Sequence, residues 1–151
     1  MRAVVQRVSY AKVEIEGRVH NAITTGLLIF LGVEGKDEKE DAAWLARKIA
    51  SLRIFADSEG LMNKDVNEIS GEALVISQFT LHAKTKKGTR PSYIRAAKPD
   101  VAVPLYEDFV DYLHDEIRGS VKTGKFGADM KIDMENDGPV TILIDTHQKD
   151  F

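Results

Sequence analysis

The segment Gly26–Val33 reads GLLIFLGV and contains no polar side chain. A continuous apolar run of this length is typical of a strand that is covered on both faces, because a strand with one wet face alternates apolar and polar residues. The run is far too short to cross a bilayer as a helix. It therefore predicts a buried central strand with a layer of structure on each side, and no membrane contact.

Two further strands are predicted before this run. Residues Arg2–Ile15 alternate and are rich in valine, which places Val4 and Val8 on one face and Val5 on the other. After a turn, Val19–Ile23 can return as a second strand.

Two amphipathic helices are predicted after the Gly26–Val33 run. The first begins at Asp37, where Asp37 and Glu40 have the spacing of a capping box, and the second begins at Pro104. The apolar residues that repeat every three or four positions are Ala42, Leu45, Ile49 and Leu52 in the first helix, and Leu105, Phe109, Leu113 and Ile117 in the second.

The remaining strands complete the fold prediction. Arg53–Phe55 is a short strand and Ala73–Ile76 a buried one, while Lys131–Glu135 and Val140–Ile144 alternate on either side of the stretch NDGPVT. That stretch predicts a hairpin turn. The order is β-β-β-α-β-β-α-β-β, so residues 1–151 are expected to form a single α+β domain with layered or barrel-like, mostly antiparallel β-sheets and two amphipathic helices.

Composition excludes several classes of function. The net charge of −3 argues against a general DNA-binding protein, although the segment Lys84–Lys98 carries six basic residues and no acidic one. There is no cysteine, and the four histidines have no ligand spacing, so neither a metal nor a cofactor is expected. The N-terminal residues do not have the layout of a signal peptide, which predicts a cytoplasmic protein.

The chemistry is expected at the end of the Ala73–Ile76 strand, where the sequence continues as SQFTL at 77–81. The GxSxG, GxxxxGK and HExxH patterns are missing from the sequence. Main-chain N–H groups and polar side chains at a strand end can still stabilise an oxyanion when the substrate is already activated. A nucleophilic Thr80 activated by His82 is an alternative, since the two side chains would share a face if the strand continued.

The two motifs SQFTL at 77–81 and NDGPVT at 136–141 resemble the signatures of the D-aminoacyl-tRNA deacylases. The resemblance extends to Gln6–Val8, the GLLIFLGV run, Arg53–Phe55, Met62–Asn63, Arg90–Ser92 and TGKFGADM at 123–130, so it covers nearly the whole chain. It implies an enzyme that hydrolyses the ester of D-aminoacyl-tRNA, and also of mischarged glycyl-tRNA. Ser77, Gln78, Phe79 and Thr80 are then the expected catalytic segment, assisted by the 2′-hydroxyl of the substrate.

The resemblance also implies a homodimer that binds the acceptor end of aminoacyl-tRNA. Gly138 and Pro139, joined by a cis bond, would enter the pocket of the partner subunit and reject L-amino acids, with Arg7 holding them in place. Phe126 and Met130 would enclose the terminal adenosine. Two other classes stay open on the sequence: an RNA-binding module that uses the basic segment, and a structural dimer in which NDGPVT makes only interface contacts.

Overall fold

The computed structural model describes residues 1–150. Its elements in chain order are β1 (Arg2–Ile15), β2 (Arg18–Ile23), β3 (Gly26–Gly32), α1 (Lys39–Ala50), β4 (Phe55–Ala56), β5 (Met62–Lys64), β6 (Glu72–Ser77), the 3₁₀ helix η1 (Phe79–His82), α2 (Pro99–Glu116), β7 (Val121–Thr123) and β8 (Lys131–Asp145). The main sheet runs β2-β1-β3-β6-β7, with β8 paired to β1, and β4 and β5 form a separate small ribbon.

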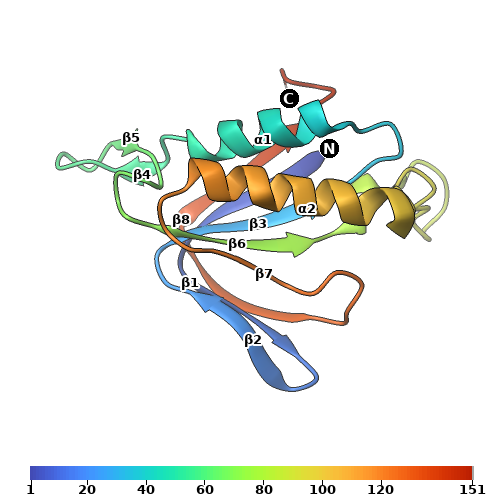
Figure 1. Ribbon diagram of the computed structural model, residues 1–151, viewed down its shortest axis with the longest axis horizontal. Coiled ribbons are helices and arrows are strands. Elements are labelled where there is room, and N and C mark those ends of the chain that lie inside the picture. Colours follow the sequence, from blue (N-terminus) through green and yellow to red (C-terminus); the bar gives the residue numbers. More distant parts are fainter. Residues whose placement is uncertain (151) are drawn as a thin grey trace.

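The two helices lie side by side across one face of the sheet, while β2 and the adjoining parts of β1 and β8 curl away from them (Figure 1). This arrangement confirms the expected α+β fold with barrel-like sheets and two helices. The pairs β3–β6 and β6–β7 are parallel, and the other strand pairs in residues 1–150 are antiparallel. No helix in this part of the chain is long and apolar enough to cross a membrane.

Strand β3 is buried on both faces, as its apolar composition predicted. Leu27, Ile29 and Leu31 belong to the core beneath the helices, and Leu28 belongs to a second core inside the curl of the sheet. Fully burying a side chain of this size contributes about 1.5–3 kcal/mol, so β3 is a principal source of stability for both layers.

Strand β1 contributes to both cores, and Val5 and Val8 lie on opposite faces of it, as the alternation predicted. Val5 lies in the core beneath the helices, but Val8 lies in the second core, and Val4 is only partly buried. The pairing of β1 with β8 is irregular between Gln6 and Val8. The extra residues at that point, 137–140, lie in β8, so the alternation of β1 continues through Val8. It changes after Val8, where the pairing with β8 shifts again before Tyr10, and Ala11 then shares the second core with Val8.

Both helices begin elsewhere than predicted. The capping box of α1 is formed by Glu38 and Asp41, since Asp37 is turned inward, away from the helix end. Helix α2 begins with Pro99 in its first turn, which leaves Pro104 inside the helix. The predicted apolar stripe of α2 is nevertheless buried at Leu105, Phe109, Leu113 and Ile117.

The stretch NDGPVT is not a hairpin turn. Its two flanking segments form one strand, β8, because both pair with the same long partner β1: Ala11 faces Met134, and Val5 faces Ile142. The chain direction therefore does not reverse, and residues 137–140 form a bulge opposite Arg7. The ribbon β4–β5 also includes a short strand at Met62–Lys64 that the sequence pattern did not predict.

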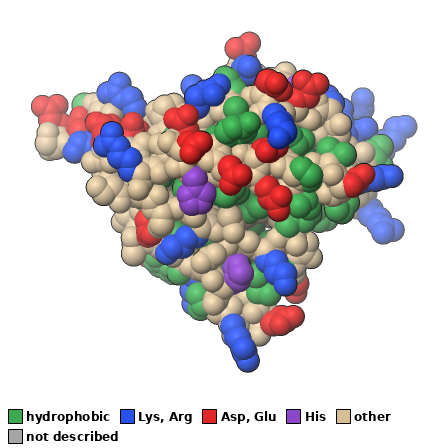
Figure 2. All heavy atoms as spheres, viewed as in Figure 1, with side chains coloured by type: hydrophobic (Ala, Val, Ile, Leu, Met, Phe, Trp, Pro, Cys, Tyr) green, Lys and Arg blue, Asp and Glu red, His purple; other side chains and the backbone are tan. Residues whose placement is uncertain are grey.

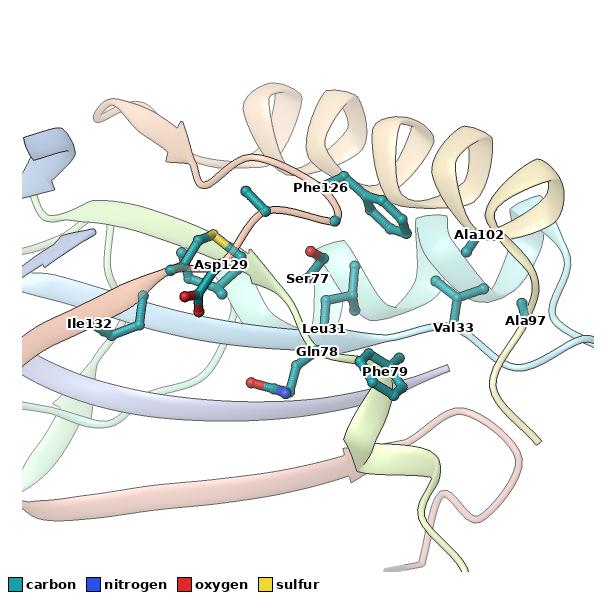
Figure 3. Close-up of a pocket in the computed structure, with 14 residues that line it drawn as sticks. Leu31, Val33, Ser77, Gln78, Phe79, Ala97, Ala102, Phe126, Asp129 and Ile132 are labelled. Atoms are coloured by element: carbon teal, nitrogen blue, oxygen red, sulfur yellow. The ribbon is translucent and has the colours of Figure 1, made fainter. Parts of the chain in front are cut away.

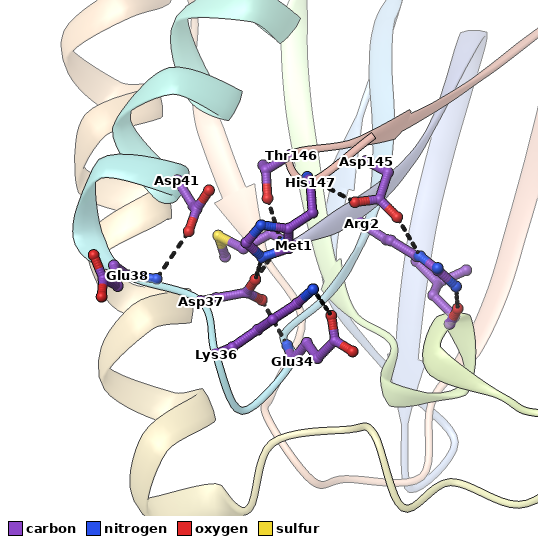
Figure 4. Close-up of polar contacts among 11 residues, drawn as sticks. Met1, Arg2, Glu34, Lys36, Asp37, Glu38, Asp41, Asp145, Thr146 and His147 are labelled. Atoms are coloured by element: carbon purple, nitrogen blue, oxygen red, sulfur yellow. Dashed lines mark hydrogen bonds and ion pairs between the residues drawn. The ribbon is translucent and has the colours of Figure 1, made fainter. Parts of the chain in front are cut away.

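The N-terminal end of β1 is joined to the end of β8 by polar contacts (Figure 4). The amine of Met1 donates to Asp37 Oδ1 at 2.5 Å and to the hydroxyl of Thr146 at 2.6 Å. Arg2 pairs with Asp145 and donates from Nη1 to the carbonyl of Leu81 at 3.0 Å. These contacts connect the strand ends to η1, the helix that contains the last three residues of the SQFTL motif.

Candidate active site

A cavity of about 310 Å³ opens where the parallel strands β3 and β6 end. Leu31 pairs with Ser77 at this edge, so the chain that follows each strand contributes to the same space. The residues that these two strand ends supply are Leu31, Val33, Ile76, Ser77, Gln78 and Phe79. The loop before β8 closes the opposite wall, and Ala97 and Ala102 complete the lining near the start of α2 (Figure 3).

The predicted catalytic segment meets this cavity over three of its four residues. Ser77, Gln78 and Phe79 line it, whereas Thr80 does not. The hydroxyl of Thr80 instead accepts a hydrogen bond of 2.6 Å from the side-chain amide of Gln78. The structure therefore places Thr80 beside the cavity as a partner of Gln78.

Two main-chain N–H groups are available at this edge. The chain enters η1 at Phe79, and the first N–H groups of a helix have no acceptor within the helix. Among residues 1–150, neither Phe79 nor Thr80 donates its main-chain N–H to a carbonyl or side chain. Such unpaired donors at a cavity wall can bind a carbonyl oxygen that becomes negatively charged.

His82 does not form a couple with Thr80. Because the chain enters a 3₁₀ helix instead of continuing as a strand, the imidazole is buried against Gly32, with 1% of its surface exposed. Both ring nitrogens lack a hydrogen-bond partner within the described chain. Burial lowers the pKa of His82, since a charged imidazolium would be poorly solvated there, so this side chain serves packing.

Phe126 and Met130 both line the cavity, on the wall opposite the strand ends. The ring of Phe126 contacts that of Tyr106 edge to face, with the centroids 5.8 Å apart. Tyr106 is itself fixed by a hydrogen bond of 2.9 Å from its hydroxyl to the carbonyl of Val75, and burial raises its pKa. A Cβ at Gly124 would lie 2.6 Å from Met130 Sδ, so a larger residue there would displace the Met130 side chain.

Sequence reasoning missed two residues of this site. Tyr106 contacts the lining residue Phe126, and its place next to the apolar stripe of α2 is the sequence signal for a tyrosine with a buried hydroxyl. Asp129 lines the cavity and is the ionisable side chain among its described lining residues. It lies within the motif TGKFGADM, but its direction depends on the loop conformation.

The bulge in β8 exposes main chain at the surface. Gly138 and Pro139 are exposed and joined by a cis peptide bond, and Gly138 has φ of +138°. Arg7 Nε donates to the carbonyl of Asp137 at 3.0 Å, and Arg7 Nη1 donates to the carbonyl of Ile54 at 2.6 Å. Asn136 closes the bulge by donating to the carbonyls of Arg7 and Val140.

The bulge and the cavity are not brought together within one chain. Gly138, Pro139 and Arg7 are not among the residues that line the cavity. Arg7 pairs with Leu27 near the beginning of β3, whereas the cavity lies beyond Leu31 at its end. A rise of about 3.3 Å per residue puts these two levels of the strand roughly 13 Å apart.

Glu34, Asp37 and His147 form an acidic and histidine group that their distant sequence positions did not reveal. Their potential ligand atoms lie within 4.8 Å of one another. Asp37 already accepts from the Met1 amine and from the N–H of Glu34, and its Oδ1 lies 2.7 Å from His147 Nε2. These contacts supply hydrogen-bond partners for the Asp37 carboxylate. The group therefore connects Met1 with the segment that follows β8.

Comparisons with known proteins agree over nearly the whole chain. A family model described as D-Tyr-tRNA(Tyr) deacylase matches residues 4–145. A D-aminoacyl-tRNA deacylase of Bacteroides fragilis (strain YCH46) is 57% identical over 150 residues, which cover 99% of this chain and 100% of the relative. The protein of the same name from Flavobacterium psychrophilum is 53% identical over the same coverage.

Two solved structures share the fold. A c-Myc DNA Unwinding Element Binding Protein superimposes with a TM-score of 0.91 at 38% identity, covering 96% of this chain and 98% of that one. A probable eukaryotic D-amino acid tRNA deacylase gives 0.80 at 16% identity, over 95% and 97%. Fold, cavity and matches define the class of protein, a hydrolase that acts on carboxylic esters. The chain belongs to the D-Tyr-tRNA(Tyr) deacylase family.

Proposed function

We propose that this protein hydrolyses the ester bond of D-aminoacyl-tRNA and releases the free D-amino acid and tRNA. The observation that carries the proposal is the mainly apolar cavity at the end of β6, lined by Phe79. The main-chain N–H groups of Phe79 and of the next residue, Thr80, have no acceptor among residues 1–150. Such a site suits a substrate that is already activated, because its donors stabilise charge without supplying a nucleophile.

The terminal adenosine of tRNA would lie against Phe126 and Met130. An aromatic ring and a thioether are suitable partners for a base, and the contact of Phe126 with Tyr106 holds its ring at the cavity wall. The aminoacyl group would then extend from the ribose toward Ser77 and Phe79 on the opposite wall. This orientation brings the ester carbonyl close to the free N–H groups.

In the chemical step, the oxygen of a water molecule attacks the ester carbonyl carbon while the N–H groups bind the developing oxyanion. The bond between that carbon and the 3′ oxygen of the ribose then breaks. The vicinal 2′-hydroxyl assists by hydrogen bonding to the departing oxygen, which takes up the proton that the water has lost. The products are the amino acid and the 3′-hydroxyl of tRNA.

Selection for D-amino acids would be made by a second subunit. Gly138 and Pro139 are exposed, held by Arg7, and too far along β3 to serve their own cavity. In a homodimer the bulge of one subunit would occupy the space where an L side chain must point in the cavity of the other. Discrimination would therefore come from exclusion of L-amino acids.

The test is hydrolysis of paired D-Tyr-tRNA and L-Tyr-tRNA by the purified protein. We expect rapid loss of the D ester and no change in the L ester over the same period. An RNA-binding module without catalysis would lengthen the lifetime of both esters, and that result would overturn the proposal. Because aminoacyl-tRNA is made and used in the cytoplasm, this activity also agrees with the cytoplasmic location expected from the sequence.

A further inference from the structure

The segment Lys84–Lys98, here called the basic loop, joins η1 to α2 and borders the mouth of the cavity. The loop is closed by a pair of main-chain hydrogen bonds between Lys84 and Ser92, of 2.8 and 3.0 Å. Its C-terminal part reaches the cavity at Ala97, and its aromatic residue Tyr93 contacts Phe79. The basic loop is therefore held in a defined conformation by hydrogen bonds and lies next to the candidate active site.

Its charge is unbalanced. All six basic side chains are exposed, and none of them forms an ion pair with an acidic residue in the described part of the chain: Lys84, Lys86, Lys87, Arg90, Arg95 and Lys98. Figures 1 and 2 show Lys and Arg side chains gathered at the end of the molecule where the pale yellow loop projects. In a protein with net charge −3, this concentration of positive charge is local.

An aromatic and apolar surface lies between these charges and the cavity. The rings of Phe79 and Tyr93 are in edge-to-face contact, with centroids 5.1 Å apart, and both are exposed. Ile94 beside them is 79% exposed. Exposed aromatic rings next to unpaired lysines and arginines are the combination that binds single-stranded nucleic acid, because bases stack on the rings and phosphates meet the charges.

We propose that the basic loop and the Phe79–Tyr93 pair dock the unpaired nucleotides of tRNA that precede the terminal adenosine, with a base stacked on Tyr93. The inference rests on the proposed function, which places the adenosine in the cavity and thus brings the preceding nucleotides out at its mouth. The lysines and arginines at the tip of the loop contact phosphates, so they strengthen binding without reading sequence. The loop makes the enzyme selective for aminoacyl groups that are attached to RNA.

The test compares two substrates, D-Tyr-tRNA and D-tyrosyl-adenosine, in which the same ester is carried by the nucleoside alone. A variant with Lys86→Ala, Lys87→Ala and Arg90→Ala loses three charges from the loop tip. We expect its kcat/KM for D-Tyr-tRNA to fall about tenfold or more at low salt, with a flatter dependence on salt. Each lost phosphate contact removes about 0.7–0.9 from the slope of log affinity against log salt. Hydrolysis of D-tyrosyl-adenosine should be unchanged.

A matched control removes three exposed charges elsewhere, through Arg18→Ala, Arg47→Ala and Lys48→Ala. This control should behave as the unaltered protein with both substrates. If the loop variant and the control lose the same activity on D-Tyr-tRNA, the loop has no special role. If the loop variant loses activity on both substrates equally, the loop acts on the geometry of the cavity, which also overturns docking.

Tyr93 tests the stacking contact separately. Tyr93→Ala should lower kcat/KM for D-Tyr-tRNA by about fivefold to a hundredfold, the range that loss of one stacked base covers, and Tyr93→Phe should restore it. Equal losses on D-tyrosyl-adenosine would show that Tyr93 only supports Phe79.

Fluorescence anisotropy with labelled, uncharged tRNA gives a readout that does not depend on catalysis. Weaker binding by the loop variant, with the control unaffected, would support docking even if neither ester were hydrolysed, a result that would count against the proposed function alone. Equal binding by the loop variant and the control would overturn the docking proposal.

Discussion

Arg7 Nε donates a hydrogen bond of 3.0 Å to the main-chain carbonyl of Asp137, immediately before the exposed Gly138–Pro139 step. The same guanidinium donates to the carbonyl of Ile54, and its side chain is 13% exposed. A side chain on β1 therefore fixes the bulge of β8 and ties it to the segment before β4.

Replacing Arg7 by alanine should impair the bulge without unfolding the protein. A hydrogen bond from a charged group contributes about 1.5–3 kcal/mol, and its loss would free the carbonyl of Asp137. We expect kcat/KM for D-Tyr-tRNA to fall about tenfold to a hundredfold, while circular dichroism shows an intact fold. Arg18→Ala, which removes an exposed arginine from β2, is the control. Full activity of Arg7→Ala would show that the bulge needs no support from this side chain.

Gly138→Ala should reduce the hydrolysis of D-Tyr-tRNA more than replacement of a turn glycine such as Gly17. A Cβ at Gly138 would lie 2.8 Å from the N of Val140 and 3.1 Å from Arg7 Nη2, at φ of +138°. At Gly17, where φ is +75°, a Cβ meets nothing within 4 Å, so Gly17→Ala costs only the local strain of about 1–2 kcal/mol. We expect hydrolysis of D-Tyr-tRNA to be lost in Gly138→Ala and retained in Gly17→Ala.

Gly138→Ala and Gly17→Ala also distinguish an effect on catalysis from an effect on dimer formation. Sedimentation measures whether the protein is a dimer, and hydrolysis is measured at the same concentration. If NDGPVT made only interface contacts, Gly138→Ala would weaken the dimer and leave the activity of each remaining dimer unaltered. That result would contradict selection by the bulge.

Thr80→Ala tests whether a side chain is the nucleophile. Thr80 does not line the cavity, and its hydroxyl accepts from Gln78, so hydrolysis of D-Tyr-tRNA should stay within about threefold of the original rate. A loss of a thousandfold or more, with tRNA binding retained and activity restored by Thr80→Ser, would establish a hydroxyl nucleophile and sink the main-chain mechanism.

Glycyl-tRNA tests selection by exclusion. Glycine has no side chain for Gly138 and Pro139 to exclude, so it should enter the cavity as a D-amino acid does. We expect hydrolysis of mischarged glycyl-tRNA at protein concentrations that clear D-Tyr-tRNA, with L-Tyr-tRNA left intact. Glycyl-tRNA that survived these conditions would indicate a site that grips the D side chain instead.

Glu72 makes stability depend on pH in the acid range. Burial opposes its ionisation, but hydrogen bonds from the Ser120 hydroxyl and from the N–H and hydroxyl of Thr24 outweigh this, and the pKa of Glu72 falls to about 2. The pKa of Glu72 in the folded state lies below the usual 4.5. The ionised carboxylate therefore stabilises the fold fully above pH 4.5, and this stabilisation is lost as the pH falls toward 2.

Glu72→Gln should therefore lower the free energy of unfolding by about 1–3 kcal/mol at pH 7 and reduce the pH dependence between about 5 and 2. Urea denaturation at a series of pH values measures both effects. Glu68→Gln provides a comparison at another glutamate. An identical pH profile for Glu72→Gln and the unaltered protein would show that this carboxylate does not stabilise the fold.

Local patterns in the sequence determined the buried strand β3, the existence of the two helices and the two motifs. The apolar run of β3 required cover on both faces, and the spacing of Leu105, Phe109 and Leu113 required a helix with one buried side. These features depend on residues that are close in the chain, so periodicity is sufficient to identify them. The predicted cavity residues Ser77, Gln78, Phe79, Phe126 and Met130 also meet at one site.

Only the tertiary structure decided how distant segments meet. Whether NDGPVT forms a turn or a bulge depends on β1, whose length allows both arms of β8 to pair with it, and no local pattern contains that information. Burial of His82 follows in the same way from the 3₁₀ helix packing on Gly32. The sequence determined that the Gly138–Pro139 step has little side chain to cover its main chain. Long-range strand pairing decided where in the structure that step is exposed.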